Sequence, residues 1–188
     1  MTAFAGVHQQ VAASAIAPIS PPTPSATLVA DSSFVSSPVP AGYSRYTRSG
    51  QYSIEFPDGA YITDLGSDYL IMTNYALRSG GCCFQPGDLK TDVSIQPMPF
   101  ETAARNSTMT PGEMGGGGQI LRQESLTLDG RDALRTWDMG GDNGADAVST
   151  IVKLSDTETL FITSFSATGD DSMHNAIETI HNSVQALN

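Results

Sequence analysis

The sequence predicts an α+β fold, in which a mostly antiparallel sheet of six to seven strands is combined with a short middle helix and a long C-terminal helix. Residues 147–154 and 159–165 are rich in β-branched and aromatic residues, and the polar segment 155–158 between them is typical of a hairpin turn. Apolar residues then recur at helical spacing from Met173 to Leu187. Because such an amphipathic helix buries its apolar face, we expect it to pack on the sheet.

The first two strands of the domain are predicted at residues 51–56 and 68–75. Apolar and polar residues alternate in the first, which predicts a half-buried strand, and the turn-forming residues 57–59 end it. The second has apolar residues on both faces, which predicts a central position in the sheet.

A third strand and the short helix follow. Residues 89–98 predict a strand with Val93 and Ile95 on one face. Pro99 is tolerated in the first turn of a helix, so it can begin a short helix that reaches Ala104.

The next two strands are predicted at residues 119–128 and 131–139. Asp129-Gly130 lies between them and is a strong signal for a tight hairpin. Trp137, the only tryptophan, is predicted in the core or on a sheet face, with a binding role as the alternative.

The chain is predicted to contain a disordered tether and one folded domain. Residues 1–42 are rich in Pro, Ser and Ala and carry Asp31 as their only charged residue, so we expect a flexible tether. Residues 43–188 form the predicted α+β domain. The apolar part of the tether is short and follows no Lys or Arg, so it predicts neither a signal peptide nor a transmembrane span. Either an export signal lies upstream of this start or the protein stays in the cytoplasm.

The charge balance argues against one class of partner. Asp and Glu number 20 against 9 Lys and Arg, which gives a net charge of −11. Such a surface repels phosphate backbones, so nucleic-acid binding is not expected. An acidic surface can attract cations or a basic partner, or it can serve solubility alone.

The two cysteines are adjacent, Cys82-Cys83. Neighbouring residues form a disulfide only in a strained ring, so a structural disulfide is not expected. The alternatives are one buried and one exposed thiol, or a redox-sensitive pair. The sequence has no Cys/His cluster with the spacing of a zinc site.

No local catalytic motif is present. The glycines at 115–118 lack the Gly-Lys-Ser/Thr ending of a phosphate-binding loop, and no Gly-x-Ser-x-Gly elbow occurs. His174 and His181 are seven residues apart on the predicted helix, about 10 Å, which is too far for one metal ion to bridge. Both are expected at the surface.

One segment offers candidate metal ligands. Residues 138–146 hold three carboxylates and an amide, the ligand types that calcium prefers, although the spacing differs from that of an EF-hand loop. The candidate metal ligands are Asp138, Asp142, Asn143 and Asp146. An ordinary exposed turn is the alternative.

Three segments resemble motifs of the PsbP-like family. They are Tyr-Ser-Ile-Glu-Phe-Pro-Asp-Gly at residues 52–59, Leu-Asp-Gly-Arg-Asp-Ala at 128–133 and Ile-His-Asn-Ser-Val at 180–184. Ala60 stands where that family usually has a tryptophan, and Val184 where it has a phenylalanine. The resemblance implies an α/β/α sandwich and a non-enzymatic, extracytoplasmic accessory protein of the periplasm, thylakoid lumen or cell surface.

The expected function is therefore that of an accessory or interaction protein that docks on a larger assembly, which the resemblance suggests could be a membrane or photosynthetic complex. We expect a protein partner to contact the sheet edge or the loops 78–88 and 110–118. The alternative is a module that binds a cation or small ligand through residues 138–146. An enzyme built around Cys82 or Cys83 is a third hypothesis, and no cofactor is expected unless calcium binds.

Overall fold

The computed structural model describes residues 38–66, 68–76, 84–107, 119–140 and 145–187. The chain divides into two units, Met1–Ser36 and Ser37–Asn188, and all the described residues belong to the second unit. The predicted tether as far as residue 37, the pair Cys82-Cys83 and the glycines at 115–118 lie outside the described residues.

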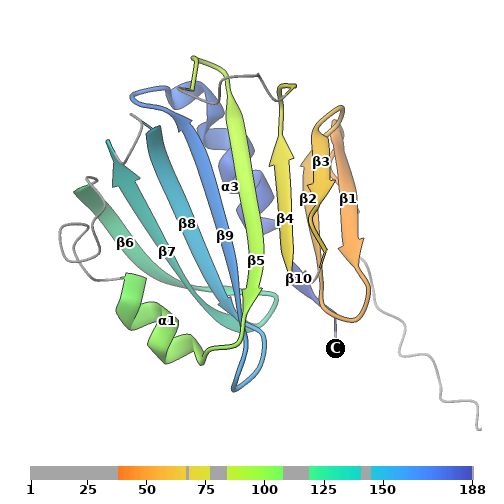
Figure 1. Cartoon of the computed structure of the whole chain (residues 1–188), viewed down its shortest axis with the longest axis vertical. Helices are drawn as coiled ribbons and strands as arrows, with labels where there is room; N and C mark the ends of the chain where they lie inside the picture. Colours follow the sequence, from red (N-terminus) through yellow and green to blue (C-terminus); the bar gives the residue numbers. More distant parts are fainter. Residues whose placement is uncertain (1–37, 67, 77–83, 108–118, 141–144, 188) are drawn as a thin grey trace, which may run out of the picture. The chain divides into compact units, whose positions relative to one another are not determined.

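A seven-stranded antiparallel sheet forms the centre of the domain (Figure 1), which confirms the predicted fold class. In spatial order its strands are β3 (Tyr61–Asp64), β4 (Tyr69–Thr73), β5 (Leu89–Gln96), β9 (Thr159–Ala167), β8 (Ala145–Lys153), β7 (Arg131–Met139) and β6 (Gln119–Leu128).

Both predicted hairpins are present. Strands β8 and β9 pair from Ala145↔Ala167 to Lys153↔Thr159. Strands β6 and β7 are joined by Asp129 and Gly130, whose φ angles of 50° and 74° are those of a turn that matches the twist of a hairpin. Asp129 also holds the segment around Ala186 in place, because its Oδ2 accepts a hydrogen bond from the amide of Ala186 at 2.9 Å.

A second sheet of three strands contains β1 (Tyr43–Arg48), β2 (Tyr52–Pro57) and β10 (Gln185–Ala186). Strand β2 lies between the other two and is buried on both faces, so the expectation of a half-buried strand was wrong. Burial of its polar residue Glu55 is compensated by Arg45, whose Nη2 lies 2.5 Å from Glu55 Oε1.

The C-terminal helix is confirmed, but it is shorter than predicted. A short 3-10 turn, η1 (Asp171–Met173), leads into α3 (His174–Asn182). The chain leaves the helix at Ser183, whose Oγ donates to Ile180 O at 2.7 Å and accepts from Glu55 N at 2.8 Å. This bond directs the next residues toward β2, so the predicted extension of the helix to Leu187 was wrong.

Helix α3 and the middle helix α1 cover opposite faces of the large sheet (Figure 1). Helix α3 contacts the face that carries Thr150 and Ser164, whereas α1 (Phe100–Ser107) lies by Leu134, whose side chain points to the other face. The hydrophobic core lies on the α3 side and includes side chains of β2, β4, β5, β8, β9 and α3. Among the described residues, no helix combines the length and apolar character needed to cross a bilayer.

Candidate functional site

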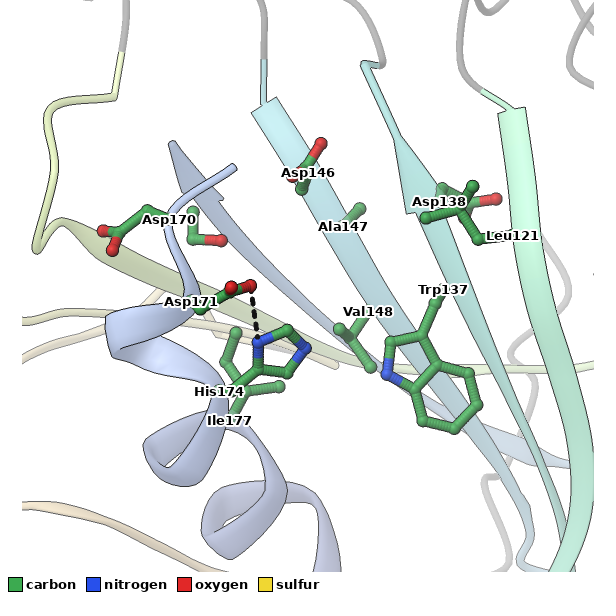
Figure 2. A pocket seen from close by; sticks show the side chains of 11 residues that line it. Leu121, Trp137, Asp138, Asp146, Ala147, Val148, Asp170, Asp171, His174 and Ile177 are labelled. Atoms are coloured by element: carbon green, nitrogen blue, oxygen red, sulfur yellow. Dashed lines mark ion pairs between the residues drawn. The ribbon is translucent and has the colours of Figure 1, made fainter. Parts of the chain in front are cut away.

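A small pocket opens between the start of α3 and the ends of strands β7 and β8 (Figure 2). Its volume is about 70 Å³, which accommodates a few water molecules or one small group rather than a large cofactor. The wall is apolar and the rim is acidic; the pocket is lined by Leu121, Trp137, Asp138, Asp146, Ala147, Val148, Ser166, Asp170, Asp171, His174 and Ile177.

Asp146 ties two loops together at this end of the sheet. Its Oδ1 accepts from the amide of Gly140 at 3.0 Å, and its Oδ2 accepts from the amide of Gly169 at 2.8 Å. Both carboxylate oxygens are thus used by the fold, although each keeps a further lone pair.

Asp170 and Asp171 lie just before helix α3 in the chain. Asp170 accepts from the amide of Gly87 at 2.6 Å and from that of Ser172 at 3.0 Å, and these bonds lower the pKa of its carboxyl. Asp171 Oδ1 lies 3.4 Å from Nδ1 of His174, the contact drawn in Figure 2. His174 is exposed, as predicted.

Asp138 has a different environment. It is half-buried at the end of β7, and burial raises the pKa of its carboxyl because the charged form loses hydration. In the strand register it lies opposite Ala147, so its side chain shares a face with that residue and not with Asp146.

Trp137 forms the sheet-side wall of the pocket. It lies on the sheet face and packs against the core, the place predicted for it. The guanidinium of Arg122 covers its ring at 4.3 Å from the centroid, and Arg122 also pairs with Glu124.

The structure therefore brings two of the four candidate metal ligands, Asp138 and Asp146, to one pocket. Asp142 and Asn143 lie outside the described residues. Within the described ranges, no group of three His, Cys, Asp or Glu side chains has the geometry to hold a metal ion. A cation site at residues 138–146 stays a prediction.

A second polar cluster lies under α3 and is centred on His181, which is fully buried at 0% exposure. Its Nδ1 lies 2.7 Å from Thr150 Oγ1, and its Nε2 lies 2.9 Å from Ser164 Oγ. The expectation that His181 lies at the surface was wrong. His181 follows Ile177 by four residues and so shares its buried face; this spacing was a usable signal.

The surroundings of the imidazole favour its neutral state. Arg135 Nε donates to Thr150 Oγ1 at 2.9 Å, and Thr150 Oγ1 also shares a hydrogen bond with His181 Nδ1. On the other side of the ring, His181 Nε2 shares a hydrogen bond with Ser164 Oγ, which shares another with Thr91 Oγ1 at 2.7 Å. Burial, and secondarily the charge of Arg135, lower the pKa of His181 to about 3, so the ring is neutral.

Ser164 Oγ and His181 Nε2 lie at hydrogen-bond distance from each other, as a serine nucleophile and its general base do. Both residues are 0% exposed, and the partners of both ring nitrogens belong to the fold. No substrate carbonyl can reach Ser164 Oγ in this conformation, so the cluster joins α3 to the sheet and does not form an open catalytic site.

The domain is similar to solved structures of low sequence identity. Cyanobacterial PsbP (CyanoP) from Synechocystis sp. PCC 6803 superposes with a TM-score of 0.54 at 13% identity, over 79% of this chain and 94% of that protein. The Ran-binding protein Mog1p of Saccharomyces cerevisiae superposes with a TM-score of 0.51 at 9% identity, over 78% of this chain and 96% of that protein. No family model matches the sequence, and a search of curated proteins found no match either. The chain has a PsbP-like fold, which confirms the resemblance seen in its sequence.

Proposed function

We propose that the protein is a non-enzymatic accessory module that binds a protein partner. The observation that carries the proposal is the contrast between a sealed polar cluster and apolar side chains left in solvent. Ser164 and His181 are inaccessible, whereas Tyr61 on β3 and Leu65 directly after it are each more than half exposed. Large apolar side chains grouped at a surface are typical of a site that a partner covers.

The similar structures support the same class of function. Mog1p is a Ran-binding protein and CyanoP is a cyanobacterial PsbP. The PsbP-like resemblance further suggests an extracytoplasmic accessory role on a larger assembly. The acidic net charge of −11 favours a partner with a basic surface.

Affinity purification from the native host tests this proposal. The full chain carries a tag, and membrane and soluble fractions are analysed separately by mass spectrometry. Recovery of one defined complex, competed by untagged protein, is the expected result. Recovery of the bait alone in both fractions would contradict an accessory role.

A second candidate function is binding of a cation or small cationic ligand at the acidic rim. It is favoured by Asp138, a half-buried carboxylate whose charged form is poorly hydrated and would gain from a cation. We expect millimolar calcium to raise the melting temperature of the full chain, and Asp138→Asn to remove the shift. Asp132→Asn, an exposed carboxylate on the same strand, is the matched control. An equal shift in all three proteins, or none in the wild type, would reject this candidate.

A further inference from the structure

The two edges of the large sheet are built differently. At one edge, the ten residues of β6 are interrupted by a register shift between Ile120 and Arg122, and Arg122 pairs with Glu124. Bulges and charged side chains are the usual means by which proteins prevent an edge strand from pairing with another chain.

The other edge is β3, and it carries apolar side chains. All four residues of β3 are exposed, and strand pairing in the described part of the chain leaves it at the end of the sheet. Ile62 is 43% exposed and Leu65, directly after the strand, is 60% exposed. We call Tyr61, Ile62, Leu65 and Tyr69 the β3 edge patch.

The backbone of β3 also offers hydrogen bonds. The amide of Leu65 donates to Tyr69 O at 3.1 Å, which makes 65 and 69 a hydrogen-bonded pair. Because such pairs alternate along an antiparallel ladder, Thr63 and Tyr61 bond toward β4. Ile62 and Asp64 therefore direct their N–H and C=O groups away from the sheet.

Charge selects among the partners that could use this edge. The exposed residues Asp58, Asp64 and Asp68 each lie within three residues of a member of the patch in the sequence, and Arg48 balances one of them through its contact of 2.6 Å with Asp64. A second copy of this acidic chain would bring like charges together, whereas a basic segment would be attracted.

We infer that β3 is the docking edge for an extended, basic segment of a partner protein. The segment pairs with β3 as an eighth strand, with backbone bonds to Ile62 and Asp64, apolar side chains beside the β3 edge patch and basic side chains beside Asp58 and Asp68. This inference deepens the proposed function and rests on it.

A defined peptide tests the inference. The probe is a fluorescent octapeptide of alternating lysine and valine, titrated with the full chain at low salt and followed by anisotropy. We expect saturable binding that weakens as salt is added, and no binding of the version with glutamate in place of lysine. No binding of the lysine peptide would overturn the inference.

Edge variants make the test specific. Ile62→Pro removes the outward amide, and Ile62→Lys adds a repelling charge; each should weaken binding at least tenfold. Met139→Lys, at a residue 42% exposed at the end of β7, is the matched control and should bind within about twofold of wild type. Equal affinity of the Ile62 variants, or an equal loss in Met139→Lys, would reject β3 as the docking edge. Circular dichroism verifies that each variant is folded.

Two further measurements separate the alternatives. A dimer of the wild type that Ile62→Lys dissociates, measured by light scattering, would assign the edge to a second copy and overturn the inference. Host complexes captured equally by wild type and Ile62→Lys would reject the β3 edge but leave the proposed function standing. Capture of no complex by wild type would reject the proposed function itself.

Discussion

His174 and His181 lie seven residues apart in the sequence and begin and nearly end the same helix, yet their surroundings are opposite. His174 is exposed at the rim of the acidic pocket, next to Asp171. His181 is fully buried, and both of its ring nitrogens contact hydroxyl groups. The difference shows that the same residue type, on one helix, joins the helix to the sheet where it is buried and lies on an acidic rim where it is exposed.

The region around His181 is expected to dominate stability. His181→Ala removes a ring from the core and leaves Thr150 and Ser164 without their partner, so we expect a loss of about 3–4 kcal/mol in the free energy of unfolding. Urea denaturation measures this. A loss below about 1 kcal/mol would mean that the cluster does not hold α3.

The pH dependence of stability should be determined largely by the same cluster. The pKa of His181 is lowered to about 3 in the folded state, against about 6.5 when unfolded, so only the unfolded state binds a proton between these values. The contribution of His181 to the free energy of unfolding is therefore fully present above pH 6.5. It decreases as the pH falls, by about 2 kcal/mol at pH 5. In His181→Ala this part of the pH dependence should vanish. Identical losses in variant and wild type between pH 7 and pH 5 would contradict the assignment.

The region of the acidic pocket is expected to contribute less to the free energy of unfolding. Asp146→Ala leaves the amides of Gly140 and Gly169 without their acceptor, and water can replace it at this exposed site, so we expect a loss of about 1 kcal/mol. Faster hydrogen exchange at the Gly169 amide is the local signature to measure. Asp146→Asn retains one acceptor oxygen, so its free energy of unfolding should decrease less. An unchanged exchange rate of the Gly169 amide in Asp146→Ala would contradict the role of Asp146 in holding the two loops together.

The smallest effect is expected at His174. His174→Ala removes an exposed side chain whose ion pair with Asp171 spans 3.4 Å, so the free energy of unfolding should change by less than about 0.5 kcal/mol. Measured beside His181→Ala, it is the matched control for the helix. Similar losses in the two variants would remove the distinction between the two regions.

Much of the fold could be predicted because its signals are local. The alternation in β5, the turn residues Asp129-Gly130 and the polar turn between β8 and β9 each lie within one element. Strands β3 and β10 were not predicted, since they have four and two residues and depend on pairing with β4 and β2. Val184 and Leu187 continue the helical spacing, but the bond between Ser183 and Glu55 ends the helix first.

The candidate site was predicted only in part. Asp138 and Asp146 were selected because they are close in sequence, and strand pairing does place both at one pocket. Asp170 and Asp171 join them from a distant loop, which no local pattern could indicate. The cluster of His181 was missed because its partners lie on β5, β7, β8 and β9, where a buried serine or threonine looks like any other strand residue.

Histidine accessibility tests the central claim most directly. The native full chain is treated with diethylpyrocarbonate, and peptides containing His174 and His181 are quantified over time by mass spectrometry. We predict that His174 is modified while His181 stays unmodified until the protein is unfolded in urea. Modification of native His181 at a rate comparable to that of His174 would show that the Ser164–His181 pair is open to reagents, and would contradict the account of this protein as a binding module with a sealed polar core.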